Sequence, residues 1–185
     1  MTNRITVLGF GGSLRKKSFN KALLRGAIEL MPKGAKLELF DLEGIPLFNQ
    51  DQETKIPEKV REFKAKIREA DAILIATPEY NYSIPGVLKN AIDWASRPYG
   101  DNALEGKPVA IMSASSGMLG GARAQYHLRQ VFVTLDMYPI NWPEVMVPFA
   151  DKKIDEEGRV TDEKTKERIK ELLDSLAVWT MKMKG

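Results

Sequence analysis

The stretch Ile5-Thr6-Val7-Leu8-Gly9-Phe10-Gly11-Gly12-Ser13-Leu14-Arg15-Lys16-Lys17-Ser18-Phe19-Asn20 joins an apolar run to an amphipathic one. Residues 5–10 are uncharged and predict a buried strand, and apolar residues at helical spacing after Asn20 predict a helix. Backbone N–H groups and the positive end of a helix form an anion site at such a junction. Arg15 can add a bidentate contact to a phosphate. A solvated basic loop containing Gly-Gly is the alternative.

The rest of the chain continues this alternation of strand and helix. We predict further strands at residues 36–41, 72–77, 109–112 and within 137–147, where Pro139 and Pro143 interrupt it. Helices are predicted at residues 20–31, 57–70, 85–95, 122–135 and 161–182. This order implies an α/β fold with helices on both faces of a parallel sheet. We expect one flavodoxin-like domain over residues 1–185, a three-layer sandwich with a five-stranded parallel sheet of order 2-1-3-4-5.

Composition limits the chemistry. The chain has no cysteine, which excludes disulfides, iron–sulfur clusters and thiol nucleophiles, so redox chemistry would need a bound cofactor. Its single histidine, His127, makes a metal site a poor expectation, and we predict none. A formal charge of +3 is too small to indicate nucleic acid or membrane binding. Residues 1–4 lead directly into the first strand without a signal peptide, so we expect a cytoplasmic protein.

Three unusual loops follow predicted strands one, three and four. They are residues 11–20, 78–86 and 113–121. All strand-to-helix loops of a doubly wound sheet leave from its carboxyl edge, and ligands bind where the strand order reverses. We therefore expect the three loops to surround one crevice.

The residue types in these loops indicate a mononucleotide. The first loop suits a phosphate, and Tyr80, Asn81 and Tyr82 suit a flat aromatic ring, although the tyrosines could instead pack in the core. The third loop consists mostly of small residues, so we expect its backbone to approach a planar ring closely. Because no elements for a second nucleotide half are present, FMN fits better than FAD or tightly held NAD.

Several motifs also resemble the NADPH-dependent FMN reductase family, and the bacterial quinone and chromate reductases in particular. They are Gly12-Ser13-Leu14-Arg15 with Ser18-Phe19-Asn20, the run Pro78-Glu79-Tyr80-Asn81-Tyr82-Ser83-Ile84-Pro85-Gly86 continuing to Trp94, and Gly120-Gly121-Ala122-Arg123. The resemblance spans nearly the whole chain. It implies non-covalent FMN and a homodimer or homotetramer. Lys17 departs from the family pattern, which often has glycine there, so the loop geometry could differ.

The resemblance also implies roles for individual residues. Ser13, Arg15, Ser18, Phe19 and Asn20 would hold the FMN phosphate. The isoalloxazine would contact the loop that begins at Pro78, namely Glu79, Tyr80, Asn81 and Tyr82, together with Ser115 and Gly117. NADPH or NADH would supply a hydride, which FMN passes to a quinone, flavin, chromate, ferric or azo acceptor. Since the cofactor carries the chemistry, we predict no catalytic side chain.

Other interpretations stay open. Glu79 could cap a helix or contact another subunit, and His127 is more simply structural than a proton donor. The helix at 122–135 presents either a solvated face or a dimer surface. The chain could be a flavodoxin-type electron-transfer protein without NAD(P)H reductase activity, but such shuttles are usually acidic and lack an arginine like Arg15. A response-regulator receiver needs an acidic cluster at the strand ends, and the first loop has no acidic residue. A P-loop nucleotidase is excluded because Gly-Lys-Ser/Thr is missing.

Overall fold

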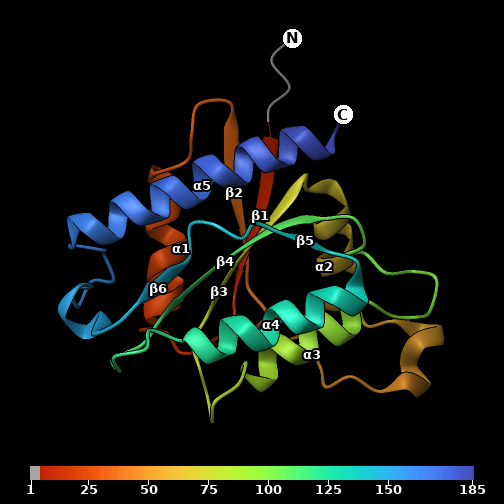
Figure 1. The fold of residues 1–185 in the computed structure, drawn as a ribbon. Helices are drawn as coiled ribbons and strands as arrows, with labels where there is room; N and C mark the ends of the chain where they lie inside the picture. Colours follow the sequence, from red (N-terminus) through yellow and green to blue (C-terminus); the bar gives the residue numbers. More distant parts are fainter. Residues whose placement is uncertain (1–4) are drawn as a thin grey trace.

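A computed structural model describes residues 5–185, so the expectation for residues 1–4 lies outside the described residues. The strands are β1 (Ile5–Gly11), β2 (Ala35–Phe40), β3 (Ala72–Thr77), β4 (Pro108–Ala114), β5 (Tyr138–Pro139) and β6 (Val145–Val147). The α-helices are α1 (Phe19–Glu29), α2 (Glu58–Glu69), α3 (Gly86–Ala95), α4 (Ala122–Leu135) and α5 (Glu163–Met183). Short 3₁₀ helices lie at η1 (Gln50–Lys55) and η2 (Ala150–Lys152). Every strand pair is parallel, and the order β2-β1-β3-β4-β5 confirms the flavodoxin-like prediction (Figure 1).

The strand at the β5 edge is divided in two. β5 pairs with the start of β4, where Tyr138 lies opposite Pro108, and β6 pairs with its end, where Val145 lies opposite Met112. Pro139 and Pro143 explain the division, because proline has no N–H group to donate to a β-ladder. The interruption predicted from these prolines is therefore confirmed.

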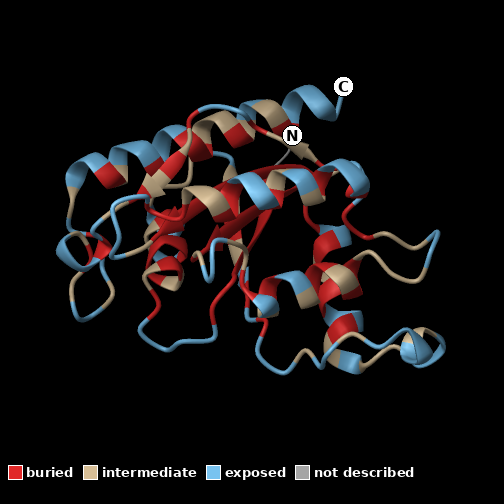
Figure 2. Ribbon diagram, turned by 60° about the horizontal axis from the view of Figure 1, so that its bottom comes forward, coloured by how far each residue is buried: buried red, intermediate tan, exposed pale blue. Residues whose placement is uncertain are grey.

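The helices form two layers that pack on opposite faces of the sheet. One buried cluster joins side chains of α1 and α5 to the sheet, and another joins those of α2, α3 and α4 (Figures 1 and 2). β3 is buried along its whole length, as a central parallel strand must be. Its alternate residues divide between the layers, with Leu74 in the first cluster and Ile73 and Ile75 in the second. Within residues 5–185, no helix is both long enough and apolar enough to span a membrane.

One element boundary matters for the site. β4 extends past the expected end at Met112 to Ala114, so Ser113 and Ala114 belong to the sheet rather than to the loop that follows. Ser113 is fully buried, and its hydroxyl donates to the Gly120 carbonyl at 2.6 Å. The third loop therefore begins at Ser115, two residues later than the sequence predicted.

Candidate nucleotide-binding site

The ends of β1, β3 and β4 bring three loops together, which we call loop 1 (residues 12–18), loop 2 (residues 78–85) and loop 3 (residues 115–121). Gly11 lies opposite Ala76, and Thr77 lies opposite Ser113. The Gly12 N–H also donates to the Ala76 carbonyl at 2.9 Å. A Cβ atom on Gly12 would lie 2.8 Å from the Thr77 hydroxyl, so glycine allows loops 1 and 2 to start in contact. The loops leave one edge of the sheet, as the topology predicts.

Loop 1 directs polar groups to the start of α1. The Ser18 hydroxyl caps the helix by accepting from the Lys21 N–H at 3.3 Å. The Ser13 hydroxyl is buried and accepts from the Arg15 N–H at 3.3 Å. The first N–H groups of α1 lack partners within the helix, as at any helix N-terminus. Lys17 does not have a positive φ, so lysine adopts this position without the backbone angle that would require glycine.

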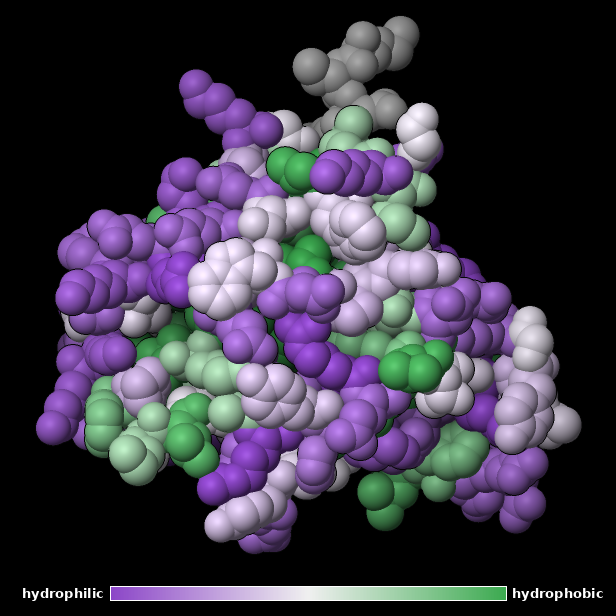
Figure 3. Space-filling model, in the orientation of Figure 1, coloured by the Kyte–Doolittle hydropathy of each residue, from purple (hydrophilic) through white to green (hydrophobic). Residues whose placement is uncertain are grey.

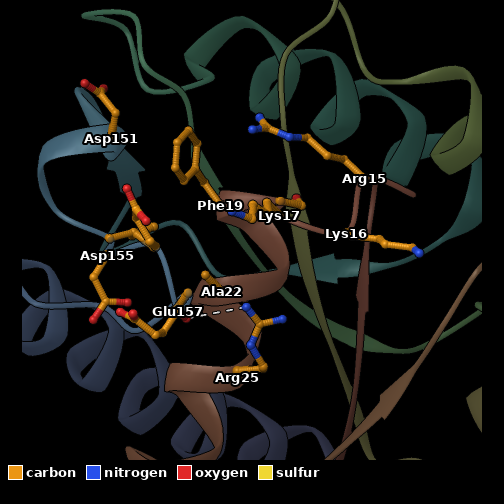
Figure 4. Close-up of a pocket in the computed structure, with 13 residues that line it drawn as sticks. Arg15, Lys16, Lys17, Phe19, Ala22, Arg25, Asp151, Asp155 and Glu157 are labelled. Carbon is orange, nitrogen blue, oxygen red and sulfur yellow. Dashed lines mark hydrogen bonds between the residues drawn. The ribbon is translucent and has the colours of Figure 1, made fainter.

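A charged hollow of about 300 Å³ lies beside loop 1 (Figure 4). Arg15, Lys16 and Lys17 are exposed at one side, and the half-buried Phe19 ring lies 5.7 Å from the Arg15 guanidinium. The other side carries the carboxylates of Asp151, Asp155 and Glu157. The Arg159 N–H hydrogen bond lowers the pKa of Asp155, so this carboxylate stays charged near neutral pH. The sequence pattern did not place these three carboxylates beside loop 1.

Asn20 holds the base of the site together. Its side chain is buried, and its amide donates to the Ala114 carbonyl at 3.0 Å and accepts from the Ala114 N–H at 2.9 Å. These bonds tie the start of α1 to the end of β4, across 94 residues of sequence. The side chain is therefore committed to the protein, and a phosphate contact from Asn20 would use its backbone N–H.

Loop 2 is a tight hairpin that presents two aromatic rings to solvent. Tyr80 and Ser83 exchange backbone hydrogen bonds of 3.0 Å, and the residues between them, Asn81 and Tyr82, have φ angles of 50° and 67°. Tyr80 is 51% exposed and Tyr82 is 67% exposed, so neither tyrosine packs in the core. Positive φ angles are costly for a tyrosine and are found most often at functional sites. Pro78, which precedes the hairpin, is buried.

Glu79 caps α4, which was one of its alternative roles. Its carboxylate accepts from the N–H groups of Arg123 at 3.0 Å and Ala124 at 3.4 Å, and from the Arg123 guanidinium at 2.6 Å. The same guanidinium lies over the Tyr82 ring, 3.8 Å from its centroid. An acidic group at a helix N-terminus is favourable, so this cluster fixes loop 2 against α4. A cofactor contact from Glu79 would therefore use its backbone.

His127 also contacts loop 2. Its Nδ1 atom lies 3.0 Å from the Ser83 hydroxyl, and its ring is on the exposed side of α4. This contact agrees with the structural interpretation of His127 rather than with a proton donor. Hydrogen bonding to the loop gives it a structural role.

Loop 3 is fixed by a segment that sequence reasoning did not assign to the site, residues 147–150. The Ser115 N–H donates to the Val147 carbonyl at 3.1 Å, and the Ala150 N–H donates to the Ser115 carbonyl at 3.0 Å. The Phe149 N–H donates to the Gly117 carbonyl at 3.4 Å. Ser115 is half-buried and Gly117 is exposed. The positive φ of Phe149 could not have been read from the sequence, because no glycine or asparagine marks it.

The donor groups fit a mononucleotide such as FMN. Loop 1 offers a helix N-terminus, two serine hydroxyls and an exposed arginine, which together suit a phosphate. Loop 2 offers exposed aromatic rings, and loop 3 offers exposed backbone at Gly117 for a planar ring. These groups lie at the point where the strand order of the sheet reverses, between β1 and β3.

The fold and this arrangement define a flavodoxin-like nucleotide-binding protein. The sequence model of the NADPH-dependent FMN reductases matches residues 5–152. The chain is 52% identical over 186 residues to an NAD(P)H-dependent FMN reductase of Pseudomonas aeruginosa, with all of both chains covered. It is 47% identical to an NADPH:quinone oxidoreductase of Arabidopsis thaliana, covering 98% of this chain and 94% of that one. The flavoenzyme FerB, an NAD(P)H:(acceptor) oxidoreductase of Paracoccus denitrificans, superimposes with a TM-score of 0.89 at 37% identity, covering 97% of this chain and 98% of that one.

The chain therefore belongs to the NADPH-dependent FMN reductase family. Its class is an FMN-dependent NAD(P)H oxidoreductase, which confirms the function, the enzyme class and the cofactor predicted from the sequence. Because relatives with 52% and 47% identity are named as reductases, the comparison favours an enzyme over an electron-transfer protein without reductase activity.

Proposed function

We propose that this protein transfers reducing equivalents from NADPH or NADH to a quinone, through FMN held by loops 1, 2 and 3. The observation that carries the proposal is one sheet edge with a basic helix N-terminus at loop 1 and an exposed aromatic hairpin at loop 2. When bound, FMN accepts a hydride from NAD(P)H and delivers it to the acceptor. Relatives named as quinone oxidoreductases support the choice of acceptor. Free flavin, chromate, ferric chelates and azo dyes are further acceptors to compare.

The chain's own residues bind and orient the cofactor in this proposal. Ser13, Ser18 and Arg15, with the first N–H groups of α1, hold the phosphate, and Phe19 packs beside it. Loop 2 holds the ring through Tyr80, Asn81 and Tyr82, while Ser115 and Gly117 approach it from loop 3. Glu79 and Asn20 act by fixing these loops. No side chain is assigned a proton-transfer step.

We also propose that the protein assembles into a homodimer or homotetramer through α4. The exposed side of this helix carries Tyr126, which is 51% exposed, and Val133, which is 81% exposed. Large exposed apolar side chains are typical of interaction surfaces when they gather on one face. Light scattering of the parent and of Val133→Lys tests this proposal. The parent is expected to be oligomeric, and an unchanged mass for the variant would exclude this part of α4 from the interface.

The function is tested on the purified protein without oxygen. The protein is expected to be yellow or to become yellow with added FMN, and NADPH or NADH should bleach it. Addition of 2-methyl-1,4-naphthoquinone should then restore the colour. A protein that gains no flavin spectrum would contradict the placement of FMN in the loops. A yellow protein that neither nucleotide bleaches would contradict the reductase activity.

A further inference from the structure

Phe149 combines two features that folding alone does not explain. Its φ angle is 51°, in the left-handed region that phenylalanine rarely adopts. Its side chain is also 45% exposed. A strained backbone and an exposed aromatic ring both reduce stability, and strained residues gather at ligand sites. These features therefore suggest that the ring at this position serves a ligand.

The backbone around Phe149 is held firmly against loop 3. Hydrogen bonds of 3.0 to 3.4 Å join Phe149 to Gly117, Ala150 to Ser115 and Ser115 to Val147. A Cβ atom on Gly120 would lie 2.8 Å from the Val147 nitrogen, so the two segments are in close contact. Since β6 ends at Val147 and η2 begins at Ala150, regular structure fixes Phe149 on both sides.

Apolar side chains of loop 3 form a rim next to Phe149 at the carboxyl edge of the sheet, and the Lys152 ammonium lies 5.7 Å from the centre of the Phe149 ring. Met118 is 74% exposed and Leu119 is 44% exposed, both in loop 3. Figure 3 shows hydrophobic side chains gathered at the lower left, where Figure 1 places loop 3 and the end of β6. Gly117, which contacts the Phe149 N–H, is one of the residues proposed to approach the flavin ring. Phe149 therefore adds an aromatic ring to this rim, next to the loop proposed to approach the flavin.

We propose that Phe149 is a specificity-determining residue for the acceptor, and that its ring packs against planar aromatic acceptors such as quinones. The inference rests on the proposed placement of the flavin ring at loops 2 and 3. Aromatic rings attract one another in offset-stacked and edge-to-face arrangements beyond simple burial, which favours a cyclic acceptor over one without a ring. The unfavourable backbone angle is tolerated because the side chain provides this contact.

The test is Phe149→Gly, because glycine adopts a φ of 51° freely and the substitution preserves folding. The matched control is Asp136→Gly, which relieves the same φ of 51° at the opposite edge of the sheet, where the Asp136 carbonyl accepts from the Gly106 N–H. Phe149→Tyr keeps an aromatic ring. Steady-state kinetics are measured with 2-methyl-1,4-naphthoquinone and with ferricyanide, which has no ring. FMN affinity and the anaerobic rate of bleaching by NADPH are measured on the same preparations.

We expect Phe149→Gly to raise the KM for the quinone by roughly 3- to 10-fold, as expected for loss of one aromatic contact. Its KM for ferricyanide, its FMN affinity and its bleaching rate should stay within about twofold of the parent. Phe149→Tyr and Asp136→Gly should behave like the parent with both acceptors. An unchanged quinone KM, an equal rise for ferricyanide, or weaker FMN binding alone would each overturn the inference. A parent protein that binds no FMN would instead overturn the proposed function.

Discussion

Arg15 is the exposed arginine of loop 1, which lies just before the N-terminus of α1. We predict that Arg15→Ala weakens FMN binding by roughly 10- to 100-fold, because a hydrogen bond to a charged group contributes about 1.5–3 kcal/mol. Fluorescence titration of the apoprotein with FMN measures the change. Arg61→Ala removes an exposed arginine from α2 and controls for net charge. Equal affinities for Arg15→Ala and the parent would refute the role assigned to this side chain.

A position can require glycine because of a positive φ angle or because a side chain has no space, and Gly120 combines both reasons. Its φ angle is 58°, and a Cβ atom would also lie 2.8 Å from the Val147 nitrogen. Gly44 has a φ angle of 86° with open space around it. Gly44→Ala should lower the free energy of unfolding by about 1 kcal/mol, and Gly120→Ala by about 2–4 kcal/mol, because only the latter adds a backbone clash. Urea unfolding compares the two, and equal losses would show that loop 3 relaxes to accept the methyl group.

Among the elements, α5 begins with a charged cap. The Asp162 carboxylate accepts from the Thr165 hydroxyl at 2.7 Å and the Thr165 N–H at 2.9 Å. These bonds, led by the one from the hydroxyl, lower the pKa of Asp162. Its stabilisation is therefore fully present above the unfolded pKa of about 3.9 and is lost as pH falls through the lower folded pKa.

We predict that Asp162→Ala lowers the free energy of unfolding by about 1 kcal/mol at pH 7, the usual effect of losing an N-cap. Asp162→Asn keeps a cap oxygen without a titrating group, so it should lose less stability than the parent between pH 5 and pH 2. Urea unfolding at pH 7 measures the effect of Asp162→Ala, and urea unfolding from about pH 5 to about pH 2 compares the parent with Asp162→Asn. If the free energy of unfolding falls equally with pH for the parent and for Asp162→Asn, Asp162 does not contribute to the loss of stability in acid.

At the scale of the whole molecule, Asn20 joins the first helix to the fourth strand through two hydrogen bonds to Ala114. Asn20→Ala would leave a buried N–H and a buried carbonyl without partners. We predict a loss of about 2–4 kcal/mol in the free energy of unfolding, together with weaker FMN binding because loops 1 and 3 lose their common anchor.

The matched control for Asn20 is Asn102, which bridges elements at the opposite edge of the sheet. Its amide donates to the Leu135 carbonyl at 3.0 Å and accepts from the Leu104 N–H at 3.0 Å. Asn102→Ala should reduce stability without changing FMN affinity. If folded Asn20→Ala protein binds FMN as well as Asn102→Ala protein does, the coupling between the two loops is absent.

The sequence alone determined the layers, the strand order and the chemical class of the three loops. Hydrophobic periodicity reports which faces are buried, so β3 and α4 were predicted with their observed boundaries, and prolines report where a ladder must break. Motifs in loops 1 and 2 were sufficient for the family. The extent of the chain as one domain stays a prediction.

Only the tertiary structure decided which polar groups meet. Asn20 and Glu79 were predicted as cofactor contacts, yet their side chains hold Ala114 and the start of α4, 94 and 44 residues away. The acidic wall beside loop 1 and the strained Phe149 beside loop 3 come from segments that the sequence pattern did not place at the site. Periodicity encodes burial, whereas the partner of a polar side chain depends on contacts between distant parts of the chain, which exist only after the sheet has formed.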